Sequence, residues 1–264
     1  MSEIRGISPQ IAAEYELSPG HTRVYVWEKP VRLAHWLMVL SLIVLSVTGY
    51  YIYNPFYISR GRTMYVMGTM RFTHLVAAWV FTAAIVLRLY WFFFGNQFSR
   101  INQFVPTTRE RWKDMVETGK YYSFRRWLPT PHLGHNAMAA AAYLGIFGVG
   151  VVEILTGLAL YNNIMHAKFL GFWVNWVFRV VDIQYVREIH FIIMYIFWIF
   201  FIHHIYSALL TDSEEKNGCL ESIFTGFKFA TQKDLQREFG AEPPAESEPP
   251  RPALKTPAPS KISS

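Results

Sequence analysis

Four long stretches of this 264-residue chain carry almost no charge. Residues 33–59 and 189–211 contain no charged side chain, 72–94 contain only Arg88, and 136–167 contain only Glu153. Each stretch exceeds the ~20 residues that a helix needs to cross the roughly 30 Å hydrocarbon core of a bilayer. The composition, with 52% hydrophobic residues, also favours a membrane protein. We therefore expect an all-α integral membrane protein, built as a bundle of four transmembrane helices.

The same charge pattern divides the chain into three parts. We expect a polar N-terminal segment over residues 1–30 and the transmembrane domain over 31–231. Residues 232–264 should form a tail that is disordered from about residue 240. The first apolar stretch begins too late and is too long to be a cleaved signal peptide, so we expect a retained helix. An aromatic, amphipathic run within 163–186 is expected to lie on the membrane surface or against a partner.

Lysine and arginine are distributed unevenly between the two ends of the predicted bundle. Eighteen lie in the N-terminal segment, the middle loop and the C-terminal tail, against six in the other two connections. Because an excess of positive charge marks the cytoplasmic side, we expect both termini in the cytoplasm and a multi-pass chain in the bacterial inner membrane. No nucleic-acid-binding motif accompanies the net charge of +6, so nucleic acid is not an expected partner.

Cys219 is the only cysteine. It excludes an internal disulfide, a cysteine-ligated iron–sulfur cluster and a c-type haem, which needs the sequence CxxCH. Any redox cofactor must therefore use other ligands, and the sequence assigns Cys219 no role.

Histidines near the ends of the apolar stretches are candidate ligands, because titratable side chains within a membrane usually have a function. His190 and His204 are 14 residues apart, roughly 21 Å and close to four turns of helix, so both project from one face. We expect His74 at the depth of His190, and His35 at the depth of His204. The sequence thus predicts two haem b groups, held by the pairs His35/His204 and His74/His190. Iron with two imidazole ligands has no open position and favours electron transfer.

Other polar side chains leave alternatives open. Arg71 and Arg187 are candidate contacts for haem propionates, or anchors at the membrane edge. Glu153 either relays protons or bonds to a neighbouring helix. For a single intramembrane histidine, hydrogen bonding to another helix is as plausible as haem ligation, although four at matched depths favour haem. We expect structural or solvated roles for His21, His132, His166 and His203.

Several short motifs occur in a specific order. They are Tyr25-Val26-Trp27-Glu28 leading to His35-Trp36, Thr48-Gly49-Tyr50, Met67-Gly68 with Arg71 and His74, Arg88 with Tyr90-Trp91, Gly95-Asn96 with Ser99-Arg100, Gly134-His135-Asn136, Thr156-Gly157 with Ala159-Leu160-Tyr161, and His204 with Tyr206. In this order they resemble the b-type cytochrome subunit of membrane-bound nickel–iron hydrogenases, over about residues 25–229. The chain departs from that family beside His190, where Ile189 and Phe191 replace a tryptophan and a second histidine.

The resemblance implies a membrane anchor and electron acceptor for the small and large subunits of a periplasmic hydrogenase. Electrons would come from iron–sulfur clusters of the small subunit and pass to menaquinone or ubiquinone, while the chain itself would not activate hydrogen. The family's four haem ligands map onto His35, His74, His190 and His204. His135 and Asn136 are candidate quinone contacts near the cytoplasmic haem, with helix capping by Asn136 as the alternative.

Two other functions remain possible at this point. The cytochrome b (gamma) subunit of a formate dehydrogenase, or of a related molybdenum oxidoreductase, shares the arrangement of four helices and four histidines. A non-haem membrane anchor or a transporter belongs to a different class, and it predicts a colourless purified protein.

Overall fold

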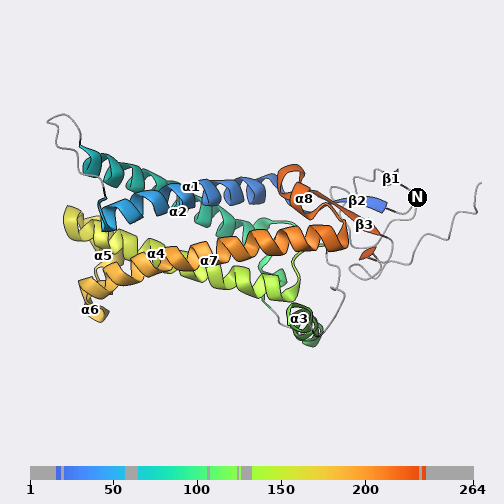
Figure 1. The fold of residues 1–264 in the computed structure, drawn as a ribbon. Helices are drawn as coiled ribbons and strands as arrows, with labels where there is room; N and C mark the ends of the chain where they lie inside the picture. Colours follow the sequence, from blue (N-terminus) through green and yellow to red (C-terminus); the bar gives the residue numbers. More distant parts are fainter. Residues whose placement is uncertain are drawn as a thin grey trace, which may run out of the picture.

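Four long helices lie side by side in the computed structural model, which describes residues 16–18, 21–56, 65–105, 108–123, 125, 133–231 and 234–235 (Figure 1). Their length and hydropathy are sufficient to cross a membrane, which confirms the expected number of candidate spans: α1 (Lys29–Tyr53), α2 (Val66–Phe94), α4 (Ala137–Met165) and α7 (Ile183–Glu215). The predictions for His132 and for disorder after about residue 240 fall outside the described residues, as does most of the N-terminal segment.

The four helices form two hairpins. The α1 backbone lies mainly against α2, and the α4 backbone mainly against α7, whereas the two hairpins meet chiefly through a buried cluster of side chains that includes Phe81, Phe147 and Phe197. Local sequence explains the helix starts: Pro30 occupies the first turn of α1, where its missing N–H costs no hydrogen bond. Asn136 caps α4 by accepting from the Ala139 N–H at 2.7 Å, and Asp182 caps α7 by accepting from the Gln184 N–H at 2.9 Å.

The connection between α4 and α7 contains two short helices, α5 (Lys168–Val174) and α6 (Val177–Val180), at one end of the bundle. Val174 and Val177 are buried against α4 and α7. Large side chains of the same segment are exposed: Phe169, Phe172, Trp173, Trp176 and Val180. The amphipathic run predicted from the sequence is therefore helical, with one apolar face packed on the bundle and another left uncovered.

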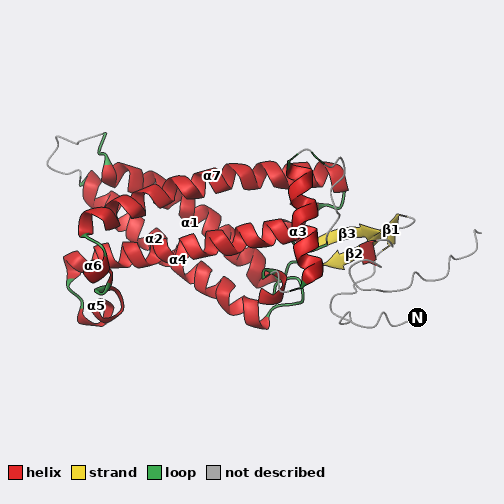
Figure 2. Cartoon of the chain, turned by 90° about the horizontal axis from the view of Figure 1, so that it is seen from below, coloured by secondary structure: helices red, strands yellow, loops and turns green. Residues whose placement is uncertain are grey.

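A small antiparallel sheet closes the opposite end of the bundle, which we call the sheet end (Figure 2). Its strands lie in the order β1 (Glu16–Ser18), β2 (His21–Tyr25) and β3 (Phe227–Thr231), and β2 and β3 pair from Tyr25↔Phe227 to His21↔Thr231. The chain is mostly helical, as expected of an all-α protein, and this small sheet is an element that the sequence did not predict. β2 and β3 are short and about 200 residues apart in the sequence, so no local periodicity indicates their pairing.

Polar contacts join this sheet to the bundle. The backbone N–H groups of Val26 and Trp27 both donate to the Gly226 carbonyl, at 2.8 and 3.0 Å. The Glu28 carboxylate accepts from Trp91 Nε1 and from the Asn96 N–H, both at 2.7 Å. The start of α1 and the end of α2 are thereby held together, and motifs that lie far apart in the sequence meet in one structural unit.

Two further helices lie at the sheet end. α8 (Cys219–Thr225) leads from α7 into β3, and α3 (Arg109–Tyr122), which follows the short 3-10 helix η1 (Ile101–Gln103), crosses the end of the bundle (Figures 1 and 2). Asp114 of α3 accepts from the Ala137 N–H at 3.1 Å, so α3 supports the first turn of α4. The middle loop is therefore partly helical.

We predict that Gly226→Ala destabilises the sheet end locally. Gly226 has φ +92°, and an added Cβ would lie 2.7 Å from the Trp27 carbonyl oxygen. A side chain in this backbone region costs about 1–3 kcal/mol. Hydrogen–deuterium exchange should show the β3 amides opening more readily by about that free energy. Gly145→Ala is the matched control, since its Cβ would meet nothing within 4 Å; equal exchange in both variants would contradict the prediction.

Candidate functional site

The structure brings the four predicted ligand histidines together as two pairs between the hairpins. His35 of α1 and His204 of α7, the inner pair, have ring centroids 6.3 Å apart near the sheet end. His74 of α2 and His190 of α7, the outer pair, have ring centroids 6.4 Å apart near the α5–α6 end. All four side chains are partly buried, and α7 contributes one member to each pair.

The separation of the rings suits a shared metal atom. A metal about 2 Å from one nitrogen of each imidazole, with roughly 1 Å more from nitrogen to ring centre, gives centroids roughly 6 Å apart. Both measured separations match this value. The Nδ1 atom of His35 is also shielded from solvent and has no hydrogen-bond partner among the described residues. Both pairs therefore fit haem iron ligated by two histidines.

Threonine hydroxyls orient both rings of the outer pair. Thr48 Oγ1 lies 2.9 Å from His74 Nδ1, and Thr156 Oγ1 lies 3.0 Å from His190 Nδ1. Each hydroxyl donates its only proton to a carbonyl one turn earlier in its own helix, at 2.7 Å to Val44 and 2.9 Å to Val152. Each threonine must therefore accept a proton from the histidine. The proton lies on Nδ1, and Nε2 keeps the lone pair that can bind a metal.

A glycine follows each of these threonines and makes room for the histidine. A Cβ on Gly49 would lie 3.2 Å from His74 Cε1, and a Cβ on Gly157 would lie 3.0 Å from His190 Cε1. The Thr-Gly sequence thus has two parts, a hydrogen-bond acceptor and a close approach of the helix backbone. The pair in α1 contacts His74 of α2, and the pair in α4 contacts His190 of α7.

A spacing of 14 residues recurs on all four long helices. The pairs of positions are His35 and Gly49, His74 and Arg88, Tyr143 and Gly157, and His190 and His204. Fourteen residues are two heptads, which return to nearly the same face in a left-handed bundle. The outer level therefore contains two histidines and two glycines, whereas the inner level contains two histidines, an arginine and a tyrosine.

Tyr143 connects the inner pair to the sheet end. Its ring centroid lies 5.8 Å from that of His204 and 4.6 Å from that of His135. His135 also packs against Trp27 at 4.8 Å and Phe104 at 5.2 Å. The predicted quinone contact therefore lies in an aromatic cluster beside the inner pair, and Asn136 caps α4 with its oxygen.

Arg88 is the second polar residue at the inner level and is only 5% exposed. Its Nη1 donates to the Ser99 carbonyl at 3.2 Å, and its guanidinium lies 4.3 Å from the Phe92 ring centroid. Within the described part of the chain Arg88 makes no ion pair. A buried cation of this kind is costly unless an anion accompanies it.

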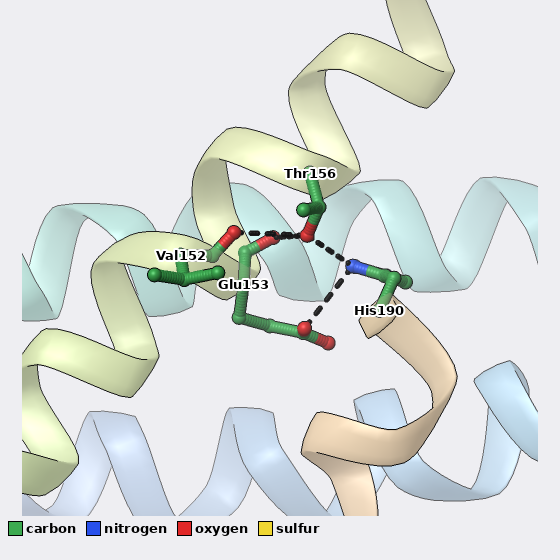
Figure 3. A network of polar contacts seen from close by, with 4 residues as sticks. All are labelled: Val152, Glu153, Thr156 and His190. Atoms are coloured by element: carbon green, nitrogen blue, oxygen red, sulfur yellow. Dashed lines mark hydrogen bonds and ion pairs between the residues drawn. The ribbon is translucent and has the colours of Figure 1, made fainter. Parts of the chain in front are cut away.

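Glu153 lies beside the outer pair. Its Oε2 is 3.1 Å from His190 Nδ1, the same nitrogen that Thr156 contacts (Figure 3). Both side chains are mostly shielded, at 18% exposure for Glu153 and 23% for His190. Of the two interpretations from the sequence, contact with a neighbouring helix is therefore observed.

The remaining candidates are peripheral. Arg71 and Arg187 are exposed near the α5–α6 end, where Arg187 donates to Gln184 at 3.3 Å. His166 and His203 are exposed. Burial raises the pKa of the Cys219 thiol, against the opposing effect of Lys228, so the thiol stays protonated near neutral pH.

The two Thr-Gly pairs are recognisable in the sequence as motifs near the candidate ligands, but their contacts with histidine are not. Their recurrence in the first and third apolar stretches, at the expected outer depth, is the signal that identifies them. Arg88 and Tyr143 become visible in the same way, through the 14-residue spacing on every long helix.

Comparison with known proteins identifies the family. Residues 26–226 match the family model described as prokaryotic cytochrome b561. The probable Ni/Fe-hydrogenase 1 B-type cytochrome subunit of Escherichia coli K12 is 36% identical over 220 residues, covering 77% of this chain and 90% of that protein. The probable Ni/Fe-hydrogenase B-type cytochrome subunits of Cupriavidus necator (77% and 86% covered) and Bradyrhizobium diazoefficiens (81% and 89%) are each 33% identical. The chain therefore belongs to the prokaryotic cytochrome b561 family, together with these b-type cytochrome subunits of nickel–iron hydrogenases.

Proposed function

We propose that this chain is the di-haem cytochrome b subunit of a membrane-bound nickel–iron hydrogenase. It anchors the enzyme in the inner membrane and passes electrons from the iron–sulfur small subunit to the quinone pool. The observation that carries the proposal is the presence of two histidine pairs, 6.3 and 6.4 Å between ring centroids, at opposite ends of one helical bundle. The names of the relatives support the hydrogenase partner.

Each part of the site has a defined task. Bound haem b supplies one-electron chemistry. His35 and His204 hold the inner group, and His74 and His190 hold the outer one. Thr48 and Thr156 keep the outer ligands in the tautomer that leaves Nε2 available. Because α7 carries His190 and His204 14 residues apart, the two ligands stand roughly 21 Å apart along the bundle.

The proposed direction of electron flow follows from the charges and the exposed surfaces at the two ends of the bundle. The excess of lysine and arginine assigns the sheet end to the cytoplasm, which leaves the α5–α6 end outside. Exposed aromatic residues there, such as Phe169 and Trp173, offer an apolar surface for the small subunit or for lipid. Electrons would enter at the outer pair and leave at the inner pair.

The quinone site belongs near the inner pair. His135 lies 4.6 Å from Tyr143, ring centroid to ring centroid, and Tyr143 in turn lies 5.8 Å from His204. The oxygen of Asn136 is used by the cap of α4, so its NH₂ group is the part that can reach a quinone carbonyl. We assign these residues to menaquinone or ubiquinone binding.

The first test is a haem-to-protein ratio with reduced-minus-oxidised spectra. Purified wild type should contain two b haems, and His74→Ala and His204→Ala should each lose one, because an imidazole ligand is missing. His203→Ala is the matched control, since His203 is the exposed neighbour of His204. Haem-free wild type, or two haems retained in both ligand variants, would refute the proposed sites. Failure to co-purify with a hydrogenase would refute the partner assignment alone.

Gly157→Ala should weaken retention of the outer haem. The new Cβ would lie 3.0 Å from His190 Cε1 and would displace the ring from its ligating position. Disturbing a residue that holds a metal ligand in position typically lowers the affinity for the metal ~10–100-fold. Haem loss to apomyoglobin would measure the effect. Gly148→Ala, whose Cβ would meet nothing within 4 Å, should behave as wild type, and similar loss rates in the two variants would contradict this role of Gly157.

Arg88 is placed to neutralise a propionate of the inner haem, since it is a buried cation without an ion-pair partner among the described residues. Arg71 and Arg187 remain the candidates for the outer haem. We predict that Arg88→Met weakens retention of the inner haem by ~10-fold or more, the effect of losing a charged hydrogen bond. Arg88→Lys keeps the charge and should lose less. Equal retention in wild type and Arg88→Met would show that this arginine serves only packing.

A further inference from the structure

The two ligands of the outer pair have almost the same surroundings, with one exception. Both Thr-Gly pairs hold a histidine of the neighbouring helix, and both threonines contact the carbonyl three residues earlier, at 3.3 Å for Leu45 and 3.0 Å for Glu153. The side chain at that position is leucine in α1 and glutamate in α4. Among the residues that the structure describes, the ligand from α7 therefore has a carboxylate beside it and the ligand from α2 has none.

The surroundings of the inner pair differ more strongly from those of the outer pair. His35 Nδ1 has no hydrogen-bond partner among the described residues, and the inner level carries the cation of Arg88. By contrast, His74 and His190 each give their Nδ1 proton to a threonine. Within the apolar stretches, the one acidic side chain and the threonine acceptors thus lie at the outer level, and the one cationic side chain lies at the inner level. Arg71 and Arg187 are exposed at the α5–α6 end, beyond these stretches.

Glu153 acts on His190 at close range. Its Oε2 lies 3.1 Å from His190 Nδ1, is shielded from solvent and completes no hydrogen bond within the described chain, so its contact with His190 is electrostatic. Figure 3 shows the carboxylate and the Thr156 hydroxyl converging on this one nitrogen. A carboxylate this close to Nδ1 polarises the N–H that Thr156 accepts, which makes the opposite nitrogen a stronger electron donor.

We propose that Glu153 is a positioning residue that makes the outer haem the lower-potential group of the two, through its contact with His190. A more basic imidazole and a nearby negative charge both favour ferric over ferrous iron. Removing Glu153 should therefore raise the outer midpoint potential and leave the inner one in place. The inference rests on the proposed two-haem function.

The functional consequence is a preferred direction for the electron. An electron is less stable on the outer haem than on the inner haem, so transfer from the α5–α6 end to the sheet end is downhill. Arg88 acts in the same sense at the other end, because a buried cation stabilises the added electron. A single electron passes between two haem irons, and no bond is made or broken in the chain.

Redox potentiometry of the purified full-length chain tests the proposal. Wild type, Glu153→Gln and Glu153→Asp are compared by reduced-minus-oxidised spectra, and the low-spin ferric electron paramagnetic resonance signals of the two haems are recorded. We expect Glu153→Gln to keep both haems, to raise one midpoint potential and to change only the signal of that haem. Glu153→Asp should return the potential toward wild type. Glu188→Gln is the matched control, because it removes an exposed acid two residues from His190 and should shift neither potential.

Each of the other possible results would overturn one part of the proposal. Two haems with unchanged potentials in Glu153→Gln would overturn the role of Glu153 and leave the proposed function standing. Loss of the outer haem in both the Gln and the Asp variants would assign Glu153 a structural role instead. Fewer than two haems in wild type would refute the proposed function itself, before Glu153 is considered.

Discussion

The two histidines of α7 set the geometry on which the rest of the structure depends. A helix fixes both the rise and the rotation between His190 and His204, so the two candidate haem sites are held at opposite depths on one face. Each partner histidine comes from the other hairpin. Because the ligands of each pair come from different hairpins, two bound haems would join the hairpins in addition to the side-chain cluster around Phe81, Phe147 and Phe197.

The sheet end supplies the second constraint, since it keeps the hairpins in register. Glu28 ties α1 to the end of α2, while Trp27 Nε1 donates to Ser222 Oγ of α8 at 3.1 Å. Arg32 of α1 further contacts the Phe224 carbonyl. Trp91 lies near the end of an apolar stretch, whereas the other residues of these contacts lie outside such stretches. Val26, Trp27 and Phe98 belong to a buried cluster against which Trp91 packs, and this cluster shields the hydrogen bonds of Trp27 and Glu28 from water. The depth of His35 relative to His204 depends on this unit.

The regular parts of the structure were predictable, and the irregular parts were not. Helix periodicity places the four histidines from the sequence alone, because 3.6 residues per turn holds along a whole span. The pairing of β2 with β3 and the support of α4 by Asp114 join residues that are distant in the chain, and no local pattern indicates them. The partners of His74 and His190 fall between these cases. The Thr-Gly repeat was visible, but its meaning required knowing which helices are neighbours.

The distribution of polar groups within the bundle follows from the cost of placing them there. A membrane helix tolerates a buried charge only where a partner or a cofactor offsets that cost, and the four apolar stretches contain two such charges. Glu153 has His190 as its partner, whereas Arg88 has two aromatic rings and a single carbonyl. Stability alone would favour apolar residues at both positions. Their placement at opposite depths, acidic at the outer level and basic at the inner, would favour the proposed inward movement of an electron.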